Sequence, residues 1–122
     1  MKIEHQLTSP DISMKMEKMG FEQDSLFYWI VEGEHFCSDG TKSEEGNPII
    51  TDGKPPYNFP YKTLGSAYTA SEIMNILPYN IYITKGSIYR VDYPDMNYYI
   101  KNIGLEDCLG EMACYLKENN LI

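Results

Sequence analysis

The stretch NIYITKGSIYRVDY, residues 80–93, decides the fold of this chain. Two runs rich in Ile, Tyr and Val flank the pair Lys85-Gly86, which is typical of a two-residue hairpin turn because glycine accepts a positive φ. The spacing therefore predicts two antiparallel strands, Asn80–Thr84 and Ser87–Tyr93, with Thr84 paired to Ser87.

This predicted pairing decides which side chains share a face of the hairpin, because successive side chains of a strand point to opposite faces. One face then carries Ile81, Ile83, Ile88 and Arg90, and the other carries Tyr82, Tyr89 and Val91. If the second face is left uncovered, Tyr82 and Tyr89 form a candidate contact surface.

Helices are predicted on both sides of the hairpin. Before it, Thr69 and Glu72 have the spacing of a capping box, and the helix that they begin ends near Leu77 because Pro78 follows. After it, apolar residues at helical spacing predict a helix over residues 105–118. Near the start of the chain, Ser9-Pro10 and Gly20 bound a third helix over residues 10–19.

Strands and a long connection complete the predicted order. Residues 26–32 (LFYWIVE) are typical of a strand, residues 97–101 of an edge strand, and residues 33–67 of a long acidic loop with a short strand near residues 48–51. Short connections make the later strands antiparallel. We therefore expect one domain over residues 1–122, of the α+β class, with a small, mainly antiparallel sheet of three or four strands and about three helices packed on one face.

The negative charge of the chain is concentrated in one segment. The whole chain has a formal net charge of −8, and residues 22–52 alone hold eight acids against the single base Lys42. Such a segment attracts cationic partners and repels nucleic acid. We therefore expect a basic protein as the partner and no direct contact with nucleic acid.

The candidate binding residues come from this segment and from the hairpin. They are Glu32, Glu34, Asp39, Glu44, Glu45, Asp52, Tyr82 and Tyr89.

No pattern of catalytic or metal-binding residues accompanies the acidic segment. His35, Cys37 and Asp39 offer nitrogen, sulfur and oxygen, but a structural zinc site needs four ligands in recognisable pairs, and His5 is the one other histidine. The acidic loop also departs from the spacing of a calcium-binding loop. We predict no catalytic residue, no metal site and no cofactor, and a function other than catalysis.

Cysteine usage and hydropathy predict where the protein resides. Three cysteines without a CxxC pair favour free thiols in a reducing cytosol. The first residues, MKIEHQLTSP, contain no apolar signal sequence, and the longest apolar run, residues 26–31, is too short to span a membrane. We expect a cytoplasmic protein without membrane contact, as a monomer or weak dimer.

Four segments carry a resemblance to a known group of proteins. They are the Met19-Gly20-Phe21 step with Gln23, the strand with Tyr28-Trp29, the helix from Tyr68 to Pro78, and the closing run from Glu111 to Asn119. Together they resemble small uncharacterised proteins encoded by phages and prophages of Bacteroidetes and related bacteria. The resemblance covers most of the chain outside residues 33–66, and it implies no activity and no catalytic residue.

Two functions remain open from the sequence. The first is a non-enzymatic binding or accessory protein of a phage or mobile element, whose acidic loop engages a basic host protein, for example one that binds nucleic acid. The alternative is a small-molecule-binding domain or minor enzyme, with a pocket lined by Tyr57, Tyr61 and Tyr82. The localised charge favours the first.

Overall fold

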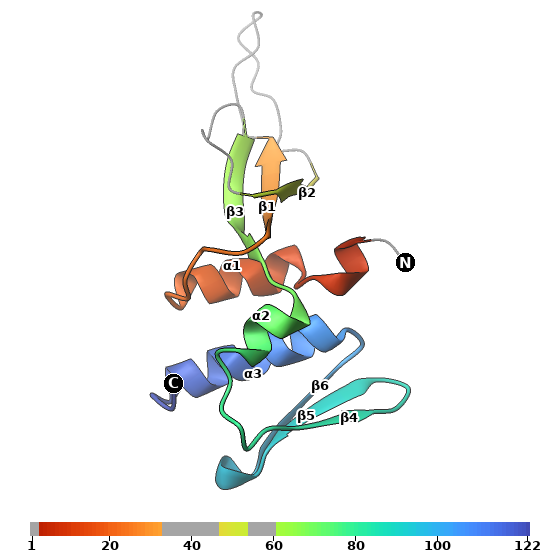
Figure 1. Cartoon of the computed structure of the whole chain (residues 1–122), viewed down its shortest axis with the longest axis vertical. Coiled ribbons are helices and arrows are strands. Elements are labelled where there is room, and N and C mark those ends of the chain that lie inside the picture. Colours follow the sequence, from red (N-terminus) through yellow and green to blue (C-terminus); the bar gives the residue numbers. More distant parts are fainter. Residues whose placement is uncertain (1–2, 33–46, 54–60) are drawn as a thin grey trace, which may run out of the picture.

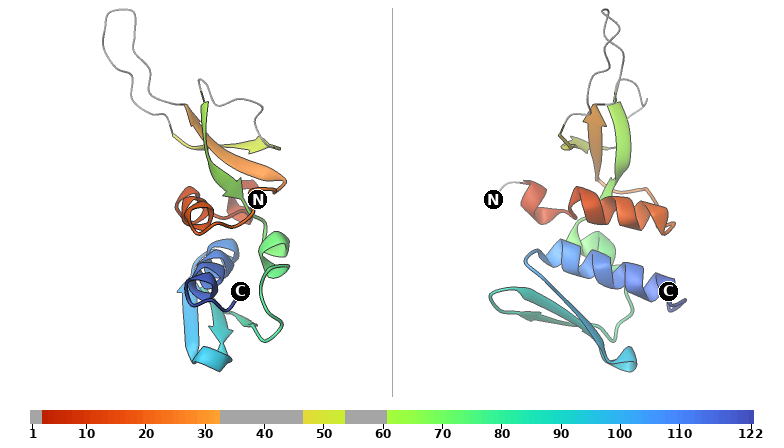
Figure 2. Two further views of the ribbon diagram at one scale, coloured as in Figure 1. Left: turned by 90° about the vertical axis from the view of Figure 1, so that its left-hand side faces the viewer. Right: turned by 180° about the vertical axis from the view of Figure 1, so that it is seen from behind.

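The computed structural model describes residues 3–32, 47–53 and 61–122. These residues form two three-stranded antiparallel sheets and three α-helices, so the α+β class and the antiparallel pairing are confirmed. The helices lie between the two sheets, as Figures 1 and 2 show from three directions. The strands are thus divided over two sheets in place of the single sheet expected from the sequence.

Helix α1, Pro10–Lys18, begins where the sequence predicts. The Ser9 hydroxyl accepts a hydrogen bond from the Ile12 amide at 3.4 Å, and Pro10 occupies the first turn. The helix ends before Gly20, whose φ of +87° suits glycine. A short 3₁₀ helix, Ile3–Gln6, precedes it.

The first sheet has the order β2-β1-β3, with β1 at Phe27–Glu32, β2 at Ile49–Asp52 and β3 at Tyr61–Ala67. Strand β3 lies inside the predicted loop of residues 33–67, so the structure differs from the sequence there. Its sequence, YKTLGSA, lacks the clear alternation by which a strand is recognised. Gly65 is required in it, because a Cβ there would lie 3.0 Å from the Ser13 carbonyl oxygen of α1.

Helix α2, Ala70–Met74, connects the two halves of the molecule. Its capping box forms as predicted, but the helix ends at Met74, before the predicted Leu77. Ile73, on the buried face of α2, packs in the larger core. This core joins buried side chains of α1, α2, the second sheet and α3, among them Met16, Val91, Ile100, Leu109 and Met112.

The second sheet has the order β4-β5-β6, with β4 at Tyr82–Lys85, β5 at Tyr89–Tyr93 and β6 at Tyr98–Asn102. A 3₁₀ helix, Pro94–Met96, links β5 to β6. The predicted register is wrong: Lys85 pairs with Tyr89, and Thr84 pairs with Arg90. Residues 86–88 make the turn in place of Lys85-Gly86.

Helix α3, Leu105–Glu118, packs on the second sheet and against α1 and α2. Its inner face is fully buried through Cys108, Leu109, Met112, Ala113 and Leu116. A smaller core of Leu7, Trp29 and Ala67 lies at the first sheet. Of the helices in the described parts of the chain, none combines the length and apolar character needed to cross a bilayer.

Candidate functional site

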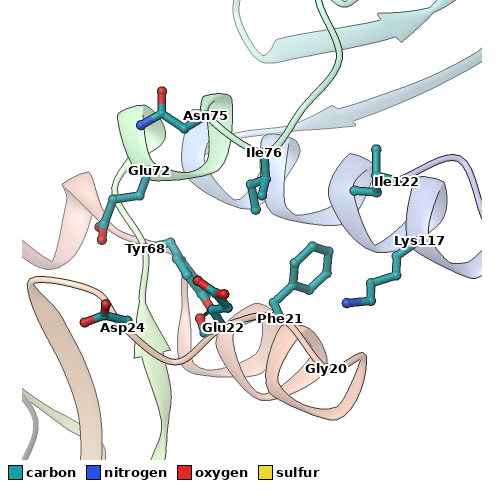
Figure 3. Close-up of a pocket in the computed structure, with 10 residues that line it drawn as sticks. All are labelled: Gly20, Phe21, Glu22, Asp24, Tyr68, Glu72, Asn75, Ile76, Lys117 and Ile122. Carbon is teal, nitrogen blue, oxygen red and sulfur yellow. Dashed lines mark hydrogen bonds between the residues drawn. The ribbon is translucent and has the colours of Figure 1, made fainter.

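A hollow of about 520 Å³ lies where α2, the end of α3 and the connection from α1 to β1 meet (Figure 3). The residues that line it come from three segments: Gly20, Phe21, Glu22 and Asp24 from the connection, Tyr68, Glu72, Asn75 and Ile76 from α2 and its flanks, and Lys117 and Ile122 from the end of the chain. These segments are far apart in sequence, and the fold brings them together.

Aromatic and aliphatic side chains form the apolar part of the hollow. Phe21 is buried against the larger core, and Ile76 points into the same space. The Lys117 ammonium lies 4.6 Å from the centroid of the Phe21 ring, which is a cation–π distance. The hollow therefore already accommodates one cation on its apolar wall.

Tyr68 fixes the connection that carries the acidic residues. Its hydroxyl donates to the Glu22 carbonyl oxygen and accepts from Gln23 Nε2 at 3.0 Å. Burial raises the pKa of Tyr68 to about 12. The phenol therefore stays protonated at neutral pH and acts as a structural hydrogen-bond donor.

Three carboxylates surround the hollow. Glu22 and Asp24 are exposed, whereas Glu72 is half-buried and its Oε1 accepts from the Thr69 amide at 3.0 Å. In the view of Figure 3, Asp24 and Glu72 lie at one end and Lys117 at the other. Because three acids face one base, the lining favours a cationic group.

Of the six predicted acidic binding residues, the structure describes the positions of two, Glu32 and Asp52. Glu34, Asp39, Glu44 and Glu45 lie outside the described residues. Glu32 ends β1, while Asp52 pairs with Phe27 at the start of β1. Five residues of strand, roughly 17 Å, separate these two positions along β1. The structure therefore does not bring Glu32 and Asp52 together.

The two predicted tyrosines lie on opposite faces of the second sheet. Tyr82 pairs with Asp92 and is 63% exposed, whereas Tyr89 packs against the larger core. The prediction that Tyr82 and Tyr89 share a face is wrong, because the turn is one residue longer than predicted and begins one residue later. The exposed face instead joins Tyr82 with Arg90 and Tyr99, whose ring centroid lies 4.0 Å from the Arg90 guanidinium carbon.

The expected tyrosine-lined pocket does not form from the described residues. Tyr61 belongs to the first sheet and Tyr82 to the second, at opposite ends of the molecule, while Tyr57 lies outside the described residues. The tyrosine in the hollow is Tyr68. The signal in the sequence was the Gly20-Phe21 step followed at once by Glu22 and Asp24, which places acids beside an apolar anchor.

The described residues offer little reactive chemistry. Burial raises the pKa of the Cys108 and Cys114 thiols to about 11, so both are protonated at neutral pH and weak as nucleophiles. Within residues 3–32, 47–53 and 61–122, no group of three His, Cys, Asp or Glu side chains is placed to hold a metal ion. His35, Cys37 and Asp39, which the sequence does not predict to form a metal site, fall outside these ranges.

Comparison with known proteins found no matching family model, no matching curated protein and no matching solved structure. The hollow and the charge of the chain are therefore the features from which a function can be inferred.

Proposed function

We propose that this chain is a non-enzymatic binding protein whose acidic surface engages a basic protein. The observation that carries the proposal is that Glu22 and Asp24, the first two acids of the segment 22–52, stand exposed beside the apolar hollow. The acidic segment thus begins beside the hollow and its apolar wall.

The hollow fits the chemistry of a lysine or arginine side chain. Such side chains bury an apolar stem and keep a charged head exposed. The stem would pack against Phe21 and Ile76, and the head would meet the carboxylates of Glu22, Asp24 or Glu72. Hydrogen bonds between guanidinium and carboxylate groups are among the stronger polar contacts in proteins.

The rest of the acidic segment supports the same partner through its field. Residues 22–52 have a net charge of −7, set by eight acids and one base, and the remainder of the chain is nearly neutral. A localised field of this kind raises the association rate of an oppositely charged protein more than it strengthens the final complex. A basic host protein, such as one that binds nucleic acid, is the proposed partner, and a phage or other mobile element is the proposed source.

The proposal is tested with a fluorescent nona-arginine peptide, followed by anisotropy and by ¹H–¹⁵N spectra of the protein. We expect the peptide to shift the amides of residues 20–24 and 72–76. The double variant Glu22→Gln/Asp24→Asn should weaken binding about threefold to tenfold, as for partly exposed charge pairs.

The matched control is Glu17→Gln/Glu118→Gln. It removes the same charge from two exposed positions outside the lining of the hollow. Equal losses in the two double variants would show that the peptide responds to net charge alone, and would overturn the assignment of the hollow.

The volume of the hollow favours one second candidate, a small-molecule-binding function, because ligand pockets commonly span about 300–1,000 Å³. The probe is n-butylguanidinium, which carries the head and stem of arginine without a protein attached. Saturable micromolar binding that displaces the peptide would favour this candidate over a protein partner.

A further inference from the structure

Strand β4 presents an open edge of the second sheet. It pairs with β5 on one side, and no described residue forms a backbone hydrogen bond with its other side. All four of its residues, Tyr82–Lys85, are exposed. Alternate residues of an edge strand direct their N–H and C=O groups away from the sheet, so the group that fits there is another extended strand.

We propose that two copies of this chain pair through β4, antiparallel and across a two-fold axis, to make one six-stranded sheet. Pairing of this kind satisfies the open backbone groups of both copies at once. A two-fold contact is self-complementary, so each copy presents the same surface to the other.

The distribution of charge favours a second copy as the occupant. Residues 82–102 carry Lys85, Arg90 and Lys101 against Asp92 and Asp95, so the charge beside the contact is close to zero. Of the described acids of this segment, Glu32 and Asp52 belong to the first sheet, at the opposite end of the molecule from β4 (Figure 1). Glu22 and Asp24 lie in the connection from α1 to β1, outside the second sheet. Pairing through β4 therefore brings together the least charged ends of two molecules that are each strongly negative.

The side chains of β4 select one register. Directly opposed residues of antiparallel strands share a face. In a two-fold pair the axis therefore passes midway between one residue and its own copy, and near the middle of β4 this residue is either Ile83 or Thr84. With Ile83 opposite its copy, the two Lys85 residues lie four positions apart, about 14 Å along the strands. With Thr84 opposite its copy they lie only two positions apart, about 7 Å along the strands, so that their separation is close to the Debye length of about 8 Å and they repel each other more strongly.

The Ile83 register also improves packing. Ile83 is 40% exposed on the face that carries the buried Val91, and in this register it meets its copy. On the outer face, Tyr82 meets Thr84 of the second copy. Aromatic and β-branched residues are favourable cross-strand neighbours.

Sedimentation velocity of the full chain, measured up to about 1 mM, tests the proposal in the range of weak complexes. We expect the wild-type chain to shift from one to two chain masses as its concentration rises. Ile83→Lys opposes two like charges on the axis and should abolish the shift. Ile88→Lys is the matched control, because Ile88 is 38% exposed and lies in the turn outside β4, and it should retain the shift.

Two variants of opposite charge distinguish a loss of dimerisation from a loss of folding. Tyr82→Lys/Thr84→Lys and Tyr82→Glu/Thr84→Glu each place like charges opposite one another, so each should be monomeric alone. An equimolar mixture should form the dimer again. A wild-type chain that stays monomeric throughout, an Ile83→Lys dimer, or a mixture that fails to pair would each overturn the proposal.

Discussion

Thr69 and Glu72 bond to one another in both directions at the start of α2. The Thr69 hydroxyl accepts from the Glu72 amide at 3.2 Å, and Glu72 Oε1 accepts from the Thr69 amide at 3.0 Å. This reciprocal pair satisfies two backbone donors that the first turn of a helix otherwise leaves open. It also fixes the carboxylate of Glu72 beside the hollow.

Removing the cap should cost about 1 kcal/mol in the free energy of unfolding, the usual value of a lost N-cap. We expect this loss for Thr69→Ala in urea denaturation. Thr69→Ser is the control, since it keeps the hydroxyl and should stay near the wild-type value. An unchanged midpoint for Thr69→Ala would show that the cap contributes nothing to the stability of the fold.

Thr8 should be a second sensitive position. Its buried hydroxyl accepts from the Tyr68 amide at 3.0 Å and lies 2.7 Å from the Ser13 hydroxyl. Thr8→Val leaves the buried Tyr68 amide without this acceptor, which should cost about 1–3 kcal/mol by chemical denaturation. Thr84→Val is the control at an exposed site, and a loss as large there would contradict the explanation.

Gly110 marks a close approach of α3 to α1. A Cβ at this position would lie 2.6 Å from Ile12 Cγ2. Gly110→Ala should therefore destabilise the protein by about 1–3 kcal/mol, although alanine is the better helix former. In an Ile12→Ala background the same change should cost much less, and a double-mutant cycle measures the difference. Equal costs in both backgrounds would mean that the two positions do not clash.

Lys117 should compete with a cationic ligand for the hollow. Lys117→Gln removes the ammonium from above Phe21 and should strengthen binding of the nona-arginine peptide. Lys18→Gln, at an exposed position of α1 outside the lining of the hollow, changes the net charge equally and serves as the control. If both variants strengthen binding to the same degree, the effect belongs to net charge and not to this site.

The buried thiols give a chemical test of the core. A raised pKa keeps little thiolate at pH 8, so Cys108 and Cys114 should react slowly with a disulfide reagent in the folded protein. In a Cys37→Ser variant, two thiols should appear only after denaturation. Fast reaction of both in the folded state would contradict the burial of these side chains.

Local signals in the sequence predicted the helices well. The bond between the Ser9 hydroxyl and the Ile12 amide, and the capping box at Thr69, depend on residues within one helical turn of each other. Such signals are complete in a short stretch of sequence. The α+β class followed from them because they place helices on both sides of the hairpin.

The hairpin shows where local signals failed. Lys85-Gly86 fits a two-residue turn, yet residues 86–88 form the turn, and Ile83 thereby pairs with the buried Val91. Packing against α3 outweighed the turn preference, because register is set by which face is buried. The shift moved Tyr89 away from the exposed face that carries Tyr82.

The hollow was the hardest feature to predict. It depends on Phe21 and Tyr68 meeting the end of α3, and no short stretch of sequence contains these partners. The division into two sheets has the same origin, since β1 pairs with β3 across a long stretch of chain. The sequence marked Glu22 and Asp24 as part of the charged segment and Glu72 as part of a capping box, but nothing in it indicated that these residues meet.

The acidic segment should contribute to association and not to folding. Glu34, Asp39, Glu44 and Glu45 belong to it and lie outside the described residues. Changing all four to Gln or Asn should leave the free energy of unfolding within about 1 kcal/mol, as expected for solvated charges. A larger loss in urea denaturation would show that these carboxylates support the fold.

The association rate of the nona-arginine peptide, measured by stopped-flow fluorescence over a range of salt concentrations, tests the central claim most directly. Acidic attraction predicts a wild-type rate that falls steeply as salt rises, and a slower, less salt-dependent rate for the variant with all four carboxylates changed. A wild-type rate that is independent of salt, and unchanged in that variant, would contradict the claim and direct attention to the exposed face with Tyr82 and Tyr99.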